Sequence, residues 1–149
     1  LPESQLDRFL MRLSLGYPDR EAERALLRGE ERRALLQRLP AVVDAEGLQR
    51  LQRAVDAVGV SDALLDELQA LLAATRDGRW FVHGLSPRAG IALLQAARAR
   101  ALVAGRDYVA PDDLHDVLIP VAAHRLVPAA GAGRDAAGQL RALVQTLAG

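Results

Sequence analysis

Ser86, Pro87 and Arg88 combine three residue types that suit the start of a helix and the binding of an anion. A serine hydroxyl can accept a hydrogen bond from a free backbone N–H of the first turn, and proline fits the first helical position because no amide hydrogen bond is lost there. Arg88 then falls in the first turn, where the unpaired N–H groups already supply about half a positive charge. A cation is unfavourable at this end unless an anion joins it, so the arrangement suits a phosphate group. The alternative is an arginine that points into water or pairs with a distant carboxylate.

The charged residues are unevenly distributed, although the 149 residues carry a formal net charge of zero. Six arginines and a single acid, Asp77, lie in the stretch from Arg76 to Arg106, and four aspartates without an arginine follow in the next dozen residues. The local positive excess favours an anionic partner near Ser86. Alternatively, the basic and acidic stretches fold against each other and cancel. All 19 basic side chains are arginine, so the chain lacks the lysine of a glycine-rich phosphate-binding loop.

Composition predicts a helical domain. Half of the residues are hydrophobic, leucine and alanine dominate them, and only 3% are aromatic, which favours helices over strands. No apolar stretch is long enough to predict a membrane span, and no leader is recognised. The absence of cysteine excludes disulfides and thiolate metal sites, and His83, His115 and His124 lack a ligand spacing, so no metal site is predicted. Because the chain opens with Leu-Pro-Glu rather than methionine, we expect a piece of a longer protein.

Helix caps, breakers and periodic leucines predict the elements that position Arg88. The expected helices cover 19–28, 30–39, 44–58, 61–78, 86–105, 111–120 and a last stretch around 140–147. Pro120 is expected to end or kink its helix. Ala110 offers no side-chain cap to the helix that follows, which should cost about 1 kcal/mol. Before these helices, alternating apolar residues over 10–15 predict a short strand after a helical turn.

Five segments occur in order along the chain: Leu-Pro-Glu-Ser-Gln-Leu-Asp-Arg-Phe (1–9), Gly-Tyr-Pro (16–18), Leu-Ser-Pro-Arg-Ala (85–89), Gly-Arg-Asp-Tyr-Val (105–109) and His-Arg-Leu (124–126). Together they resemble the C-terminal part of a MoxR-family AAA+ ATPase. The resemblance implies an all-α fold, with the helical-bundle lid of AAA+ type in residues 18–149. Residues 1–17 would be a remnant of the α/β ATPase core, with a helix turn, a strand and the hinge. The phosphate-binding loop and the acidic Mg²⁺ motif would lie upstream, so this chain alone should not hydrolyse ATP.

The resemblance implies roles for two arginines. Arg8 matches the arginine finger, which reaches the γ-phosphate held by the neighbouring subunit. A planar, always charged guanidinium suits charge that is spread over phosphoryl oxygens. A local ion pair with Glu3 is the alternative for Arg8. Arg88 matches the sensor-2 arginine, which couples the position of the lid to the state of the nucleotide.

Tyr17 and Pro18 fall on the hinge, where this fold usually holds the adenine. A flat ring or a proline face could stack there, and packing of a hinge residue in the core is the alternative. With Ser86, Pro87 and Arg88 they form the nucleotide-binding set that the resemblance implies. ATP with Mg²⁺ would be the cofactor of the full-length parent, and this fragment is not expected to hold it tightly.

The resemblance also implies a cytoplasmic parent that couples ATP binding and hydrolysis to chaperone-like remodelling of other proteins. Its partners would be the upstream core, the neighbouring subunits of a homo-oligomeric ring, expected to be a hexamer, and a protein with a von Willebrand A domain. The alternative function is a non-enzymatic helical interaction module that binds nucleic acid through the stretch from Arg76 to Arg106. The zero net charge argues against this alternative, because nucleic-acid-binding domains normally carry a basic excess.

Overall fold

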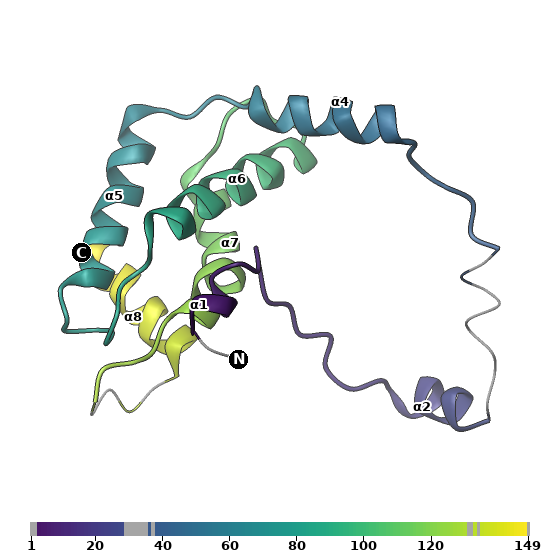
Figure 1. The fold of residues 1–149 in the computed structure, drawn as a ribbon, viewed down its shortest axis with the longest axis horizontal. Coiled ribbons are helices and arrows are strands. Elements are labelled where there is room, and N and C mark those ends of the chain that lie inside the picture. Colours follow the sequence, from purple (N-terminus) through teal and green to yellow (C-terminus); the bar gives the residue numbers. More distant parts are fainter. Residues whose placement is uncertain (1–2, 29–35, 37, 131–132, 134, 149) are drawn as a thin grey trace. The chain divides into compact units, whose positions relative to one another are not determined.

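The computed structural model describes residues 3–28, 36, 38–130, 133 and 135–148. The regular elements of these residues are helical, as the composition predicts (Figure 1). They are α1 (Glu3–Leu6), α2 (Arg20–Leu27), α4 (Ala45–Asp56), α5 (Asp62–Arg76), α6 (Pro87–Val103), α7 (Pro111–Ala122), the 3₁₀ turn η1 (Ala123–Arg125) and α8 (Ala136–Ala148). None of the described helices is both long and apolar enough to cross a membrane. The all-α fold class is therefore confirmed.

The chain divides into two compact units, which we describe separately. The smaller unit covers residues 13–51 and contains α2 and the first part of α4. Each of these helices begins at an aspartate cap: Asp19 accepts a hydrogen bond from Ala22 N at 2.8 Å, and Asp44 accepts one from Gly47 N at 2.6 Å. Both helix starts were predicted from these aspartates. The helix expected over 30–39 lies almost entirely outside the described residues, and the domain boundary between residues 17 and 18 stays a prediction.

The larger unit, residues 1–12 and 52–149, contains the hydrophobic core. Leu64, Leu68 and Leu71 are buried along α5, as the leucine spacing predicts. The face of α6 that enters the core is made mostly of small residues, which allows its neighbours to approach closely. At Gly90, for example, an added Cβ would lie 2.8 Å from a methyl carbon of Leu72. Helix α6 packs most extensively against α7.

The strand predicted over 10–15 is wrong, and the helix that was expected to end or kink at Pro120 ends two residues later. Residues 10–15 form no strand in the described structure, because a strand needs a neighbouring strand to pair with its backbone groups and no such neighbour is present among these residues. Helix α7 continues two residues past Pro120 and passes into η1. A proline near the end of a helix removes only one backbone N–H donor, so the helix can continue for a few residues. The Pro120 carbonyl accepts a hydrogen bond from Arg12 N at 2.8 Å.

The start of α7 is supported by Asp113 although it has no side-chain cap. Ala110 cannot accept a hydrogen bond with its side chain, but the Asp113 carboxylate reaches back and accepts one from Ala110 N at 2.8 Å. This is the reciprocal half of a capping box. It satisfies the N–H of Ala110 itself, which is a different donor from the first-turn N–H groups that a side chain at position 110 would cap.

Candidate functional site

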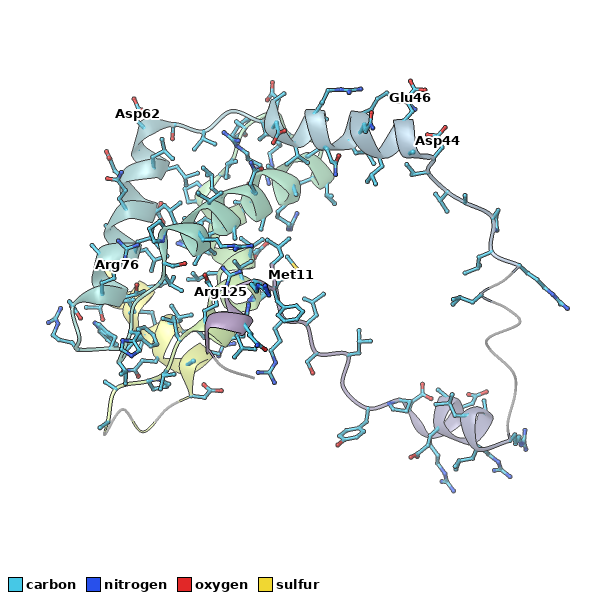
Figure 2. All side chains as sticks on the ribbon, in the orientation of Figure 1. Met11, Asp44, Glu46, Asp62, Arg76 and Arg125 are labelled. Carbon is cyan, nitrogen blue, oxygen red and sulfur yellow. The ribbon has the colours of Figure 1, made fainter. Side chains whose placement is uncertain are left out.

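The loop before Ser86 is fixed to the end of α5 through its backbone. The buried hydroxyl of Thr75 accepts a hydrogen bond from Leu85 N at 3.1 Å and donates one to Leu72 O at 2.7 Å. Arg76, labelled in Figure 2 at the end of α5, donates from Nε to Leu85 O at 2.8 Å. Both backbone polar groups of Leu85 are therefore satisfied by two consecutive residues of α5. This attachment sets where the next helix can begin.

Gly84 makes the close crossing of this loop over α5 possible. A Cβ atom at Gly84 would lie 2.7 Å from Arg76 Cα and 2.8 Å from Arg76 N. Backbone atoms in the last turn of a helix cannot move aside as a flexible side chain can. A side chain at position 84 would therefore force the loop away from α5.

Ser86 and Pro87 start α6 as predicted. Ser86 Oγ accepts a hydrogen bond from Ala89 N at 3.2 Å, and Pro87 is the first residue of the helix. Arg88 is exposed in the first turn. It makes no ion pair with any acid whose side chain is described. The first turn of α6 also contains no acidic residue.

An N-terminal segment, residues 7–10, lies against the same helix start and is held by side chains from η1. Ser86 Oγ donates to the Asp7 carboxylate at 3.2 and 3.3 Å, and Asp7 also pairs with Arg125 at 3.6 Å. Arg125 Nη2 donates to Phe9 O at 2.6 Å, and His124 Nε2 lies 3.1 Å from the same oxygen. Figure 2 labels Arg125 beside this part of the chain. We call residues 7–10 the anchored segment.

The charges around Ser86 sum to a positive excess. The side chain of Arg125 is only 4% exposed. Burial lowers the pKa of Arg125 and the positive charge of Arg88 acts in the same direction, whereas the Asp7 carboxylate raises it. Two guanidinium groups and one carboxylate, which pairs with Arg125 alone, thus lie near the positive end of α6. This arrangement suits an incoming anion such as a phosphate.

Arg8 lies in the middle of the anchored segment, just after α1. Its backbone N–H donates to Gln5 O at 3.3 Å, whereas its side chain is exposed. The guanidinium makes no ion pair with an acid whose side chain the structure describes. The alternative partner, the Glu3 side chain, lies outside that description.

Tyr17 and Pro18 belong to the smaller unit, whereas Ser86 and Arg88 belong to the larger one. Tyr17 is fully exposed and Pro18 is exposed. Stacking of an adenine on these residues stays a prediction.

The basic stretch from Arg76 to Arg106 is partly neutralised by aspartates. The three ion pairs are Arg79–Asp77 at 3.0 Å, Arg100–Asp116 at 3.2 Å and Arg106–Asp113 at 2.5 Å. The hydrogen bonds from Arg106 lower the pKa of the buried Asp113 carboxyl. Two of these pairs join the basic stretch to the acidic stretch that follows it. This pairing does not favour a nucleic-acid-binding face.

Sequence reasoning missed Asp7, Thr75, His124 and Arg125 as residues that build the site. No role in the site was predicted for His124 and Arg125, but their side chains hold the anchored segment. Arg125 also pairs with Asp7, but the other contacts of these two side chains go to backbone carbonyls, which every residue has, so no signal in the sequence could identify those contacts. Thr75 did offer a signal, because it is a polar residue at the end of a leucine-rich helix. Among the described residues, no three His, Asp or Glu side chains are grouped as a metal site.

Comparison with known proteins places this site in a family context. A family model described as the AAA lid domain matches residues 73–144, which include the whole of α6. The chain is 38% identical over 127 residues to the protein YeaC of Bacillus subtilis, 37% identical over 136 residues to the chaperone MoxR1 of Mycobacterium tuberculosis, and 33% identical over 145 residues to the protein MoxR of Paracoccus denitrificans. Each match covers 85% of this chain but only 40%, 36% and 43% of the respective relative.

A solved structure shows the same arrangement of the chain. A protein from Cytophaga hutchinsonii, described as a candidate ATPase, superposes with a TM-score of 0.79 at 27% sequence identity. The match covers 97% of this chain and 48% of the other. The chain therefore spans less than half of the length of the relatives that it matches.

Proposed function

Because this chain belongs to the MoxR family of AAA+ ATPases and carries the AAA lid domain, we propose that it is the lid of a parent ATPase whose nucleotide phosphates lie against the start of α6. The observation that carries this proposal is an exposed arginine, Arg88, in the first turn of a helix that has no acid there. An arginine at the positive end of a helix is favourable when an anion lies beside it.

The residues around Ser86 fit a phosphate group of ATP. The Arg88 backbone N–H, which the Ser86 cap does not use, and the Arg88 guanidinium would bind phosphate oxygens at this helix N-terminus. The Asp7 carboxylate would repel a phosphate if it were free, but Ser86 and Arg125 already engage it. The positive charges therefore remain in excess. When bound, ATP with Mg²⁺ would supply the phosphoanhydride whose hydrolysis drives movement of the lid.

In this proposal Arg88 senses the nucleotide of its own subunit. Its guanidinium would bind the phosphates when the lid is closed and release them when the lid opens. A contact that exists in only one of two lid positions shifts the equilibrium between them by its own binding free energy. This is the physical content of the sensor-2 role.

Arg8 would act on the nucleotide of a neighbouring subunit. Its exposed guanidinium is available to an oxygen of a γ-phosphate, and its planar fork suits the charge that develops during phosphoryl transfer. An arginine finger supplied in trans requires a second subunit beside the nucleotide. We therefore propose a homo-oligomeric parent, expected to be a hexamer.

The activity of the parent is proposed from its relatives. One of them is named a chaperone, and by analogy the parent would couple ATP hydrolysis to remodelling of other proteins. A protein with a von Willebrand A domain is the proposed partner. Tyr17 and Pro18 would hold the adenine at the hinge. This chain contains no lysine, so the phosphate-binding loop would be supplied by an upstream core.

The proposal is tested in the full-length parent by measuring ATP turnover at protein concentrations that allow rings to form. Arg8→Ala should lower turnover by about a thousandfold or more, with nucleotide affinity unchanged, because the finger acts on the site of a neighbour. Arg88→Ala should lower turnover and also weaken binding of a fluorescent ATP analogue in the same subunit. Arg141→Ala, at an exposed arginine of α8, is the matched control. Unaltered turnover in both the Arg8 and the Arg88 variants would reject the assigned roles.

A further inference from the structure

We propose that Arg125 is the positioning residue for Arg8, because it fixes the anchored segment to the start of α6 in the same subunit. The proposal rests on the function proposed above, since it concerns how the finger is presented to a neighbouring nucleotide. It adds a physical link between the two arginines of one subunit.

Arg125 and its neighbours hold the main chain on both sides of Arg8. On one side, Asp7 pairs with Arg125 at 3.6 Å and accepts hydrogen bonds from Ser86 Oγ at 3.2 and 3.3 Å. On the other side, Arg125 Nη2 donates to Phe9 O at 2.6 Å. The residues before and after Arg8 are therefore fixed, although the Arg8 side chain itself is exposed.

Arg125 is buried, which indicates that its main role is to make these contacts. A guanidinium that is 4% exposed has lost most of its hydration, which is costly unless the lost interactions are replaced. Within the described residues, Nε and Nη1 of Arg125 have no hydrogen-bond partner. Its hydrogen bonds go from Nη2 to the carbonyls of Phe9 and Leu10, at 2.6 and 3.4 Å. The anchored segment is thus what compensates the buried charge.

A fixed backbone with a free guanidinium suits a finger. An arginine side chain alone loses rotamer entropy when it is immobilised, and a mobile backbone would add to this cost. Because residues 7 and 9 are already fixed, the entropy of the Arg8 backbone is lost before the neighbouring subunit binds. A displacement of a catalytic group by about 1 Å can lower the reaction rate about a hundredfold, so the contacts that fix Asp7 and Phe9 should affect turnover.

The contacts of the anchored segment also connect Arg8 to α6, the helix that contains Arg88. Ser86 Oγ accepts a hydrogen bond from Ala89 N, which caps α6, and donates to Asp7. A rotation of α6 would therefore carry the anchored segment with it. The nucleotide that Arg88 contacts in one subunit would in this way influence the finger that is presented to the next.

The attachment can be measured without any activity assay, because the chain contains no cysteine. Spin labels attached at Arg8→Cys and at Ile91→Cys, an exposed position of α6, report the distance between the anchored segment and this helix. We expect a narrow distance distribution in the otherwise unchanged chain. It should broaden at least twofold with Arg125→Lys, which cannot reproduce the planar fork, and with Asp7→Asn. Arg100→Ala removes a surface ion pair and is the matched control, which should stay narrow.

Each outcome of this measurement decides the proposal. Narrow distributions in both the Arg125→Lys and the Asp7→Asn backgrounds would overturn it. If Arg125→Lys fails to fold, as judged by circular dichroism, Asp7→Asn decides alone, since Asp7 is about one third exposed and its change to an amide removes charge but little volume.

Turnover of the full-length parent then tests whether the attachment serves Arg8. Arg125→Lys should lower kcat by about tenfold to a hundredfold while KM for ATP changes less than about twofold. In the partly active Arg8→Lys background, Arg125→Lys should cause little further loss, because both changes act through one guanidinium. Losses that multiply instead would show that Arg125 acts elsewhere and would refute the positioning role. Full turnover of Arg8→Ala would refute the proposed finger itself, and the distance measurement would still judge the attachment.

Discussion

Replacement of Thr75 by valine removes the hydroxyl that connects α5 to the loop before Ser86. The two side chains have nearly the same shape, so the substitution changes hydrogen bonding with little change in volume. It leaves Leu85 N without its partner at 3.1 Å, in a residue that is only 1% exposed. Water cannot easily replace the lost hydroxyl there. The Thr75 side chain itself is fully buried, so the new methyl group is also shielded from water.

The expected destabilisation follows from two opposing effects. A buried donor without an acceptor costs about 1–3 kcal/mol. The methyl group that replaces the hydroxyl returns up to about 0.8 kcal/mol through its burial. The free energy of unfolding of the larger unit should therefore fall by about 1–2 kcal/mol. For a chain of this size that corresponds to a decrease in Tm of roughly 2–8 °C.

Denaturant unfolding followed by the fluorescence of Trp80, the only tryptophan in the chain, measures this change. Trp80 reports on the larger unit, because its carbonyl accepts a hydrogen bond from Ala129 N at 3.0 Å. Thr146→Val is a matched control, since Thr146 is the only other threonine and its hydroxyl donates to Ala142 O on an exposed helix face. It should change the unfolding free energy by less than about 0.5 kcal/mol. Equal effects of the two substitutions, or none at Thr75, would contradict the role of the buried hydroxyl.

Two further predictions concern the same unit and use the same fluorescence assay. Gly84→Ala should destabilise more than Gly59→Ala, because the new Cβ would lie 2.7 Å from the Arg76 backbone but no closer than 3.4 Å to any atom at the control position; similar losses would argue against the close crossing. Asp113→Asn should destabilise the chain at pH 7, and the difference from the unchanged chain should shrink as the pH falls below about 4. Because Arg106 lowers the pKa of Asp113 below its unfolded value of 3.8, the stabilisation is complete above that value and is lost as the folded carboxyl becomes protonated. A difference that persists undiminished at low pH would show that the charge of Asp113 is not responsible.

The helix starts could be predicted from sequence because their causes are local. Asp19, Ser61 and Ser86 each accept a hydrogen bond from a backbone N–H three residues later, so a short stretch of sequence contains the whole interaction. The same is true of the leucine stripe on α5, which the structure buries. The strand expected over 10–15 failed for the opposite reason, because pairing depends on a distant neighbour that alternation alone does not reveal.

The surroundings of Arg88 could be predicted only in part. The helix start follows from Ser86 and Pro87, whereas the partners of the other arginines in the basic stretch had to be left open between solvent and aspartate. Contacts such as Arg125 to Phe9 join residues 116 positions apart, and they are made to a backbone oxygen. A resemblance to a family can mark His124 and Arg125 as notable. It cannot say what they hold.

The anchored segment is held by the Asp7 carboxylate and, at positions 9 and 10, by its carbonyl oxygens, and the carbonyl contacts give the attachment an unusual tolerance. Side chains at positions 9 and 10 could be exchanged without weakening the hydrogen bonds that Arg125 makes, provided the peptide path is kept. A lid of this type could change the surface beside Arg8, the proposed finger, to suit different neighbours while the backbone of Arg8 keeps its position.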